Sequence, residues 1–398
     1  MDKIDELLTR GVDKIYPSKE ALEKLLRSGK KLRLYQGFDP SGTRLHIGHM
    51  VGLKKLSQFQ TLGHKVIFLI GDFTGMIGDP SGKTNTRKPL TREQVLSNAK
   101  DYKTQAKKIL RFDGKNPIEI KFNSEWNSKL TFEDIIRLAS HFTAQQMIER
   151  DMFQARLKEG KEISLVEFLY PIMVAYDAVS MNVDIEIGGT DQTFNMLAGR
   201  KLTQHTLKKE KFVITVPLLT DATGRKLGKT EGNAIGINDP PDEFYAKIMS
   251  LGDDAIIPCF TLITDTLMEE INVIKKNLSQ GKNPMQYKKL LAFTLTKMLN
   301  SKEDAMKAQE YFERTFQRKD LTGEIPTFKI NAAETISVID LISNLKLTSS
   351  RSEAKRLIIE GAVEFDSGKI TNPQQTIKPR TGMIVKVGKH RFVKLVIP

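Results

Sequence analysis

The sequence predicts an α/β protein in which a parallel-sheet domain is followed by an α-helical region and a small α+β module. Residues 31–38 and 64–71 are short apolar runs typical of buried strands, and apolar residues recur at helical spacing between them. A strand–turn–helix pattern returns near residue 190. Strand, helix and strand in that order indicate a parallel sheet of the nucleotide-binding kind.

Composition limits the class of protein. At 398 residues, the chain is long enough for two or three domains with at least one buried core. Its hydrophobic and charged contents, 39% and 28%, are ordinary for a soluble globular protein. The single cysteine, Cys259, excludes an internal disulfide framework and fits a reducing compartment. The acidic amphipathic start is unlike a secretory signal, and no apolar run approaches the roughly 20 residues that span a bilayer. We therefore expect a cytoplasmic protein.

The expected parallel sheet lies in a first domain, residues 1–234. The runs KLRLYQGF and HKVIFLIG are its first two strands, and Gly63 marks the end of the helix between them. The stretch VDIEIGGTDQTFNML, residues 183–197, supplies the later strand, turn and helix. These elements predict a Rossmann-like domain.

Two further domains and a linker are expected. Residues 235–322 show a mostly helical, lysine-rich pattern. Residues 323–334 are expected to be a linker, because the surrounding stretch RKDLTGEIPTF carries Gly and Pro. Residues 335–398 show helix signals up to Gly361 and then short alternating strands.

Charge is concentrated in the last of these regions. The net charge of +14 favours a polyanionic partner or a negative membrane surface, although a solubility charge spread over the surface explains it as well. Residues 335–398 hold 11 Lys and Arg against 5 Asp and Glu, a net 6 of the 14 charges. A lysine-rich helix alone is more often a solvated face, but a compact basic module on a linker is typical of an RNA-binding appendage. The candidate RNA-binding residues are Arg351, Lys355, Arg356, Lys386, Lys389 and Arg391.

The stretch DPSGTRLHIGH, residues 39–49, joins the first strand to its helix. A strand end followed by a glycine turn and a helix N-terminus directs several backbone N–H groups toward one point, where an anion is favoured. Gly42 and Gly48 allow backbone or ligand to approach closely. His46 and His49 can donate hydrogen bonds to phosphate or sugar oxygens, although either could be a structural histidine. A zinc site is disfavoured, because no further His/Cys cluster supplies the remaining ligands.

Two glycine-rich loops carry further cations. TGRKLGKTEGN, residues 223–233, holds Lys226 and Lys229, which suit a leaving pyrophosphate. IGDPSGKTNTR, residues 77–87, holds Lys83 and Arg87 but lacks the spacing of a Walker P-loop.

These motifs carry a resemblance to a known family. HIGH and KLGKT are similar to the HIGH and KMSKS signatures of class I aminoacyl-tRNA synthetases. YQGFDPSGTRLHIGH, TGMIGDPSGK, YPIMVAYD and IGGTDQ, in that order, resemble the bacterial tyrosyl-tRNA synthetases. The basic tail resembles the S4 RNA-binding domain, so the resemblance covers nearly the whole chain. It implies a tyrosine–tRNA ligase, an enzyme that activates L-tyrosine with ATP and transfers it to the 3′-terminal adenosine of tRNA(Tyr).

The resemblance also implies roles for matching residues. Tyr35 and Asp177 grip the substrate phenol, and Asp79 and Tyr170 hold its α-ammonium. Asp191 accepts from the ribose hydroxyls. The implied tyrosine-binding residues are Tyr35, Asp79, Tyr170, Val174, Asp177 and Gln192. The implied ATP-binding residues are Gly37, Asp39, Gly48, His49, Gly189, Asp191 and Lys229. The implied catalytic group is Ser41, His46, His49, Lys83, Arg87, Lys226, Lys229 and Thr230.

Cofactor and partners follow from the same resemblance. It implies ATP as a substrate with Mg²⁺ that phosphates and water hold, rather than a protein cage. No tightly bound cofactor, no protein-held metal and no membrane are expected. The partners are tRNA(Tyr), L-tyrosine, ATP and a second copy of the chain in a homodimer.

The sequence departs from the family pattern at two places. Val174 stands where many relatives carry a glutamine that helps to hold the amino acid, and its isopropyl group can neither donate nor accept. Gln192 or a water could compensate. KLGKT replaces KMSKS but keeps both lysines, with Thr230 for the last serine, so phosphate chemistry is expected to survive.

Three alternatives stay open at this point. A tryptophanyl-tRNA synthetase shares the catalytic fold, but Tyr35, Asp177 and the S4-like tail argue against it. A free-standing nucleotidyltransferase would leave the basic tail and the paired lysines unexplained. A non-catalytic RNA-binding descendant of a synthetase is disfavoured, because the positions expected to touch phosphate are still basic or polar.

Overall fold

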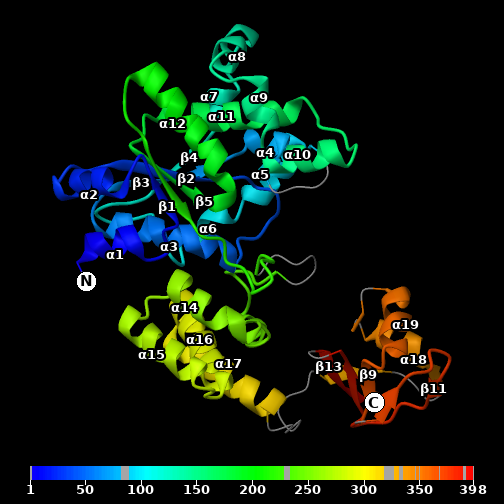
Figure 1. Cartoon of the computed structure of the whole chain (residues 1–398). Coiled ribbons are helices and arrows are strands. Elements are labelled where there is room, and N and C mark those ends of the chain that lie inside the picture. The colour runs from blue at the N-terminus through cyan, green and yellow to red at the C-terminus, as the bar shows by residue number, and fades with distance from the viewer. Residues whose placement is uncertain are drawn as a thin grey trace. The chain divides into compact units, whose positions relative to one another are not determined.

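The computed structural model shows two compact units, residues 1–309 and 310–398 (Figure 1). It describes residues 2–81, 89–227, 234–317, 327–330, 335–345, 347–348, 350–366, 368–388 and 391–397. No helix of the described chain is both long and apolar enough to cross a membrane.

The first unit is built on a six-stranded sheet with the order β1-β6-β5-β2-β3-β4. Its strands are β1 (Lys14–Tyr16), β2 (Arg33–Phe38), β3 (Lys65–Ile70), β4 (Glu119–Phe122), β5 (Ile185–Gly189) and β6 (Phe212–Val216). All neighbours pair in parallel except β1, which is antiparallel to β6. The parallel sheet predicted from the sequence is confirmed.

The strand order reverses between β2 and β5. From β2 the chain adds β3 and then β4 on one side, and later adds β6 beyond β5 on the other side. Loops diverge at such a reversal, so the carboxyl ends of β2 and β5 border an open crevice, the usual ligand position in a doubly wound sheet.

Helices cover both faces of this sheet. They are α1 (Lys3–Thr9), α2 (Lys19–Arg27), α3 (Ile47–Thr61), α4 (Thr74–Ile77), α5 (Arg92–Ala99), α6 (Tyr102–Ala106), α7 (Ser124–Asn127), α8 (Phe132–Ala139), α9 (Ala144–Ile148), α10 (Asp151–Lys158), α11 (Val166–Met181), the 3₁₀ turn η1 (Thr190–Gln192) and α12 (Thr193–Leu207). α3 buries the residues that repeat at helical spacing, such as Leu53 and Phe59. It ends where expected, because Gly63 has a φ of +81°, a conformation that costs glycine little.

The rest of the first unit is helical, as its sequence pattern predicts. It contains α13 (Pro241–Met249), η2 (Asp253–Ala255), α14 (Ile256–Ile263), α15 (Met268–Ser279), α16 (Pro284–Leu299) and most of α17 (Lys302–Phe312). The end of α17 and the π-helix η3 (Glu313–Gln317) belong to the second unit. α14 packs against α3, so the helical region shares the first unit with the sheet. The division expected at residue 234 stays a prediction.

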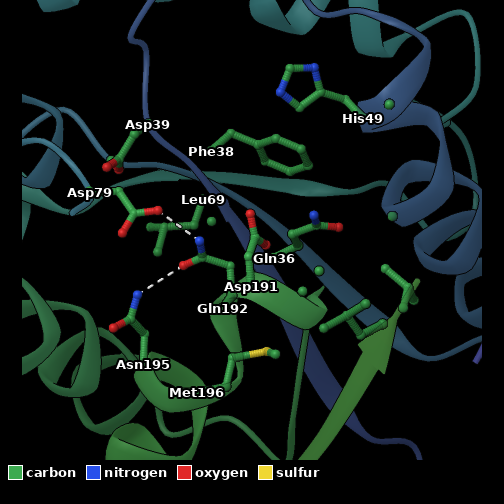
Figure 2. A pocket seen from close by; sticks show the side chains of 18 of the residues that line it. Gln36, Phe38, Asp39, His49, Leu69, Asp79, Asp191, Gln192, Asn195 and Met196 are labelled. Carbon is green, nitrogen blue, oxygen red and sulfur yellow. Dashed lines mark hydrogen bonds between the residues drawn. The ribbon is translucent and has the colours of Figure 1, made fainter. Parts of the chain in front are cut away.

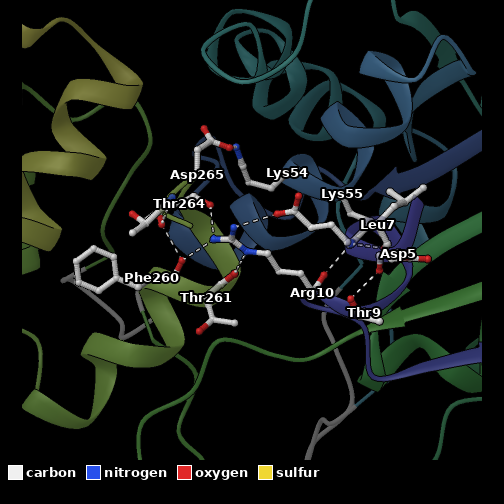
Figure 3. A network of polar contacts seen from close by, with 12 residues as sticks. Asp5, Leu7, Thr9, Arg10, Lys54, Lys55, Phe260, Thr261, Thr264 and Asp265 are labelled. Carbon is white, nitrogen blue, oxygen red and sulfur yellow. Dashed lines mark hydrogen bonds and ion pairs between the residues drawn. The ribbon is translucent and has the colours of Figure 1, made fainter. Parts of the chain in front are cut away.

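A polar network fastens α1 to α14 (Figure 3). The Arg10 guanidinium donates to the carbonyl oxygens of Phe260, Thr261 and Thr264, at 2.9–3.0 Å. Lys55, on α3, donates from Nζ to the carbonyls of Leu7 and Arg10, both at 2.7 Å. Two cations thus serve the carbonyls that the helix C-termini leave without intrahelical donors.

The second unit is a small α+β module, as expected. Its five-stranded sheet has the order β10-β9-β12-β13-β7, and β11 pairs with β8 separately. The strands are β7 (Thr327–Lys329), β8 (Ile336–Ser337), β9 (Val363–Phe365), β10 (Gly368–Ile370), β11 (Thr376–Ile377), β12 (Ile384–Val387) and β13 (Arg391–Val396). The helices α18 (Val338–Asn344) and α19 (Arg351–Ile359) pack on one apolar core with the strands.

One boundary expected from the sequence is wrong. Residues 323–334 were predicted to be a linker, but Thr327–Lys329 forms β7 and pairs in parallel with residues 394–396 of β13. A three-residue strand has too short a pattern to be recognised locally, and its partner lies near the other end of the module.

Candidate active site

A pocket of about 260 Å³ lies at the carboxyl ends of β2 and β5, beside the N-terminus of α3. All the predicted tyrosine-binding and phosphate-side residues of the described chain line it. They are Tyr35, Gly37, Asp39, Ser41, His46, Gly48, His49, Asp79, Tyr170, Val174, Asp177, Gly189, Asp191, Gln192 and Lys226. Lys83, Arg87, Lys229 and Thr230 lie outside the described residues.

The two histidines form the start of α3. His46 precedes the helix, and its Nδ1 accepts from the backbone N–H of Gly48 at 3.1 Å. Nδ1 of His49 accepts from the backbone N–H of His46 at 3.0 Å. Because each Nδ1 is an acceptor, the proton of each neutral ring is on Nε2. The His-x-x-His spacing is therefore the spacing of a reciprocal helix cap, and it leaves Nε2 as the donor atom of each ring.

Of the two glycines in this turn, Gly48 is the one packed closely against a described residue. A Cβ on Gly48 would lie 3.0 Å from the His46 ring, whereas a Cβ on Gly42 would meet nothing within 4 Å. The group close to Gly48 is thus a side chain, and the expected approach of a ligand at either glycine stays a prediction.

Asp177 accepts three side-chain hydrogen bonds in the pocket. Its Oδ1 accepts from Trp126 Nε1 at 2.7 Å and Asn127 Nδ2 at 2.9 Å, and Oδ2 accepts from Asn123 Nδ2 at 3.1 Å. Burial raises the pKa of Asp177 to about 8, although these three donors act in the opposite direction. The result is a buried, rigidly oriented acceptor at the inner end of the pocket.

Tyr35, on β2, faces the same inner end. Its side chain is 1% exposed, and its hydroxyl makes no hydrogen bond of ordinary geometry to a described residue. Burial raises the pKa of Tyr35 well above its usual value, and the carboxylates of Glu186 and Asp177 raise it further. A hydroxyl donor and a carboxylate acceptor therefore stand ready for a polar group that enters the pocket.

Glu186 and Lys211 form a buried ion pair below Tyr35. Lys211 Nζ donates to Glu186 Oε2 and also to the carbonyl oxygen of Met196, at 3.1 Å in the second case. Both side chains are buried, and burial lowers the pKa of Lys211. The pair places a compensated carboxylate on the pocket wall, since Glu186 also lines the cavity.

A second set of acids lies toward the α4 side of the pocket. Tyr170 Oη donates to Asp39 Oδ2 at 2.8 Å, and Thr74 Oγ1 donates to Asp39 Oδ1 at 2.7 Å. Asp79 Oδ2 accepts from Gln192 Nε2 at 2.7 Å, and Gln192 also contacts Asn195 (Figure 2). This part of the pocket is suited to a cation such as an ammonium group.

Asp191 and Lys226 meet at the mouth of the pocket. Lys226 Nζ lies 2.7 Å from Asp191 Oδ2, and both side chains are partly exposed. Lys226, which is expected to face pyrophosphate, is thus ion-paired with Asp191, the carboxylate that is expected to hold the ribose. Exposed pairs of this kind contribute little to stability, so the contact is easily exchanged for a ligand.

Sequence reasoning missed the residues that support the pocket. Trp126, Asn123 and Asn127 come from the stretch NSEWN directly after β4, and Glu186 lies inside the motif that contains Asp191. A polar run at the carboxyl end of a parallel strand was a usable signal for the first three. No local signal marks Lys211, because its partner lies on the neighbouring strand.

The predicted RNA-binding residues of the second unit are largely engaged in ion pairs. Arg351 pairs with Asp340, Lys386 with Glu364, and Arg391 with Glu353, while Arg356 Nη1 lies 4.0 Å from Glu360. Lys355 is exposed on α19, and Lys389 lies outside the described residues. Their role in RNA binding stays a prediction.

Within the residues that the structure describes, no three His, Cys, Asp or Glu side chains cluster in a way that could hold an ion.

The fold and the pocket define the class of protein: a synthetase core with its ligand crevice at the strand reversal and a His-x-x-His helix start. A family model described as tRNA synthetases class I (W and Y) matches residues 27–317. Solved structures agree in fold. A C-terminally truncated mitochondrial tyrosyl-tRNA synthetase of Aspergillus nidulans has a TM-score of 0.65 at 21% identity, covering 79% of this chain and 94% of that one. The Archaeoglobus fulgidus tyrosyl-tRNA synthetase complexed with L-tyrosine has a TM-score of 0.60 at 22% identity, covering 77% and 98%.

Curated relatives narrow the class. The tyrosine–tRNA ligase of Thermotoga maritima is 43% identical over 392 residues, which are 98% of this chain and 96% of the relative. That of Dehalococcoides mccartyi is 44% identical over 397 residues, 99% of each chain. The chain therefore belongs to the tyrosine–tRNA ligase family of class I synthetases, as the sequence motifs predicted.

Proposed function

We propose that this pocket carries out both steps of tyrosine–tRNA ligation. In the first, L-tyrosine and ATP give tyrosyl-adenylate and pyrophosphate. In the second, the tyrosyl group passes to the 3′-terminal adenosine of tRNA(Tyr). The observation that carries the proposal is the buried pair of Tyr35 and Asp177, with one hydroxyl and one oriented carboxylate aimed at the inner end of the pocket.

This pair suits a phenol and penalises phenylalanine. A substrate hydroxyl can accept from Tyr35 Oη and donate to Asp177. A benzyl side chain would leave both groups buried and unpaired, which costs about 1–3 kcal/mol for each such group. The substrate α-ammonium is then bound by Asp79 and Tyr170, and Gln192 lies close to the substrate carboxylate.

ATP is proposed to lie along the start of α3. Nε2 of His46 and of His49 and the hydroxyl of Ser41 face the polyphosphate, and the helix N-terminus adds its dipole. Gly37, Gly48 and Gly189 leave room for the nucleotide beside Asp39, and Asp191 takes the ribose hydroxyls. Lys83, Arg87, Lys226, Lys229 and Thr230 are proposed to stabilise the departing pyrophosphate.

The chemistry requires neither a protein nucleophile nor a general base. The ionised tyrosine carboxylate attacks the α-phosphorus, and the bond to the β-phosphate oxygen breaks, so that pyrophosphate leaves with the electron pair. Catalysis is then positioning together with stabilisation of the developing charge. Mg²⁺ that arrives with ATP neutralises phosphate charge, held by phosphates and water.

A homodimer in the cytoplasm is proposed as the working form. Phe132 and Ile136 lie one helical turn apart on α8 and are 78% and 56% exposed. Together they form an exposed apolar patch, which is more typical of an interface than single exposed apolar residues are. The first residues of α11 add Val166, also exposed. Phe132→Asp is expected to convert a dimer to monomers in sedimentation experiments. The control is Leu267→Asp, a change of an exposed residue in the helical region after residue 234, which should leave the dimer intact.

ATP–pyrophosphate exchange with tyrosine, phenylalanine and tryptophan, each supplied alone, tests the proposal. We expect exchange with tyrosine only. Exchange with tryptophan would contradict the assignment of Tyr35 and Asp177, and no exchange with any of the three would favour a non-catalytic protein.

A further inference from the structure

Asp79 belongs to a closed ring of hydrogen bonds, of which Figure 2 shows the contact of Asp79 with Gln192 and that of Gln192 with Asn195. Its Oδ2 accepts from Gln192 Nε2 at 2.7 Å, and its Oδ1 accepts from the backbone N–H of Ser81 at 2.9 Å. Gln192 Oε1 accepts from Asn195 Nδ2 at 2.9 Å, and the same nitrogen lies 3.5 Å from Ser81 Oγ, a long contact that closes the ring. Both oxygens of the Asp79 carboxylate are therefore fixed.

Arg150 supports this ring from the protein interior. Its Nη2 donates to Ser81 Oγ at 2.8 Å, and its guanidinium lies 4.6 Å from the centre of the Phe194 ring. The residue is 8% exposed, and Asp79 is the largest of the negative influences that oppose the effect of burial on its pKa. Arg150 is thus a buried cation whose charge complements Asp79 through Ser81.

The direction of each amide in the ring matters. A carboxamide has one donor end and one acceptor end, so Gln192 can donate to Asp79 only while its Oε1 points elsewhere. Asn195 Nδ2 donates a hydrogen bond to this Oε1 and so fixes the direction of the Gln192 amide. Asn195 is fully buried, so its amide, rather than bulk water, supplies the donor to Gln192 Oε1 in the folded protein. Without it, Gln192 is free to turn its oxygen toward Asp79, where two acceptors repel.

Few other groups can stabilise a cation at this end of the pocket. Val174 supplies no polar atom, and Tyr170, whose hydroxyl donates to Asp39, offers an ammonium group only the lone pairs of a neutral oxygen. The orientation of the Asp79 carboxylate therefore decides how well an ammonium group is bound.

We propose that Asn195 and Arg150 are positioning residues for amino-acid binding, which hold Gln192 and Asp79 in the orientation that receives the substrate α-ammonium. The inference rests on the proposed amino-acid site at Asp79. Neither residue needs to touch the substrate, because each acts through a neighbour in the ring.

Two ligands separate this role from a general structural one. L-tyrosine has the α-ammonium, and 3-(4-hydroxyphenyl)propionate has the same phenol and carboxylate without it. In the full-length protein, Asn195→Ala should raise the Kd of tyrosine by about fivefold or more and leave the Kd of the propionate within about twofold. Asn195→Asp fits the same space but places an oxygen opposite Gln192 Oε1, so it should weaken tyrosine at least as much.

Asn116→Ala is the matched control. Asn116 is a half-buried asparagine whose amide also donates twice, to the carbonyls of Gln60 and His64, but it lies outside the pocket. This variant should change the affinity of neither ligand. Each variant is assayed below its own melting temperature, so that only folded protein is compared.

The two Asn195 variants and Asp79→Asn together test the proposed positioning role. Equal weakening of both ligands by Asn195→Ala, or no weakening of tyrosine by either Asn195 variant, would overturn the inference. Asp79→Asn is run beside them as the reference for loss of the ammonium site. If that variant also fails to distinguish the two ligands, the proposed amino-acid site is wrong; if it distinguishes them and Asn195→Ala does not, only the ring has been misjudged.

Discussion

Asp177→Asn tests the phenol site, because the structure dictates which hydrogen bond it breaks. Asp177 accepts three hydrogen bonds, two at Oδ1 and one at Oδ2. An asparagine amide can keep the pair at one oxygen, from Trp126 and Asn127. Its NH₂ then faces Asn123 Nδ2, and Asn123 cannot turn without losing the bond from the Phe73 N–H to its Oδ1, at 2.9 Å.

The substitution therefore carries two costs. One lost bond with two buried donors face to face should destabilise the protein by about 1–3 kcal/mol. The substrate phenol also exchanges a charged acceptor for a neutral one, a difference of about 1–2 kcal/mol, or roughly fivefold to thirtyfold in the preference for tyrosine over phenylalanine.

Trp126 makes the assay direct. It is the single tryptophan of the chain, and its indole N–H donates to Asp177. Its fluorescence should respond to tyrosine binding in the wild type and to a smaller extent in Asp177→Asn. Binding is measured near pH 8.5, where the carboxylate is ionised, and pyrophosphate exchange with tyrosine and phenylalanine gives the preference. Unchanged preference, with normal fluorescence and stability, would refute this account of the pocket.

The same variant has a pH signature. Burial raises the pKa of folded Asp177 to about 8, above its unfolded value of 3.8, so the folded state binds the extra proton. Asp177 therefore contributes stability that is fully present below about pH 4 and is lost as the pH rises toward 8. The stability advantage of the wild type over Asp177→Asn should shrink between about pH 5 and pH 8 in urea titrations, and a gap that stays constant over this range would mean that the carboxyl is ionised throughout.

Other changes follow the same logic. Tyr35→Phe removes a buried hydroxyl that makes no ordinary hydrogen bond to a described residue, so it should leave the unfolding free energy unchanged or higher while narrowing the preference for tyrosine by about twofold to tenfold in exchange assays. Lys226→Ala should slow adenylate formation by about tenfold, or 1.4 kcal/mol, in single-turnover experiments, and a variant that instead weakened tyrosine binding would contradict its phosphate role. Lys211→Met should destabilise by about 3–5 kcal/mol, because it leaves Glu186 as a buried unpaired charge, and adding Glu186→Leu should recover most of that loss in thermal unfolding. Truncation after residue 317 should keep tyrosyl-adenylate formation but weaken tRNA binding and flatten its salt dependence; an unchanged salt slope would make the basic module a solvated surface.

Local pattern was sufficient for the framework of the first unit. The strands at 33–38 and 65–70, the helix between them and its end at Gly63 depend on apolar spacing and on one glycine conformation, which neighbouring residues determine. Most of the chemistry-bearing residues were named from motifs that resemble the synthetase family, and the parallel sheet explains why two of them meet: Asp39 and Gly189 both lie at carboxyl ends of its strands. This geometry gathers Asp39 and Gly189 although 150 residues separate them.

What the sequence could not supply were partners fixed only by tertiary packing. The donors to Asp177 lie 50 to 54 residues earlier in the same connection between β4 and β5, and Lys211, directly before β6, meets Glu186 on β5. The strand at 327–329 was mistaken for a connection, because its pairing partner is more than 60 residues away. Each is a long-range contact, and none leaves a periodic trace in the chain.

The contact of Arg10 with the end of α14 has a consequence for synthesis on the ribosome. The Arg10 guanidinium donates to the carbonyl oxygen of Phe260, a residue that the ribosome adds 250 residues after Arg10. At typical elongation rates, that interval is on the order of 10–50 s. During this time, the N-terminal helix has left the exit tunnel without the partner that completes its environment. Until the helical region emerges, the side chain of Arg10 is without its carbonyl partners at the end of α14. Slow or paused translation between residues 10 and 260 prolongs this interval.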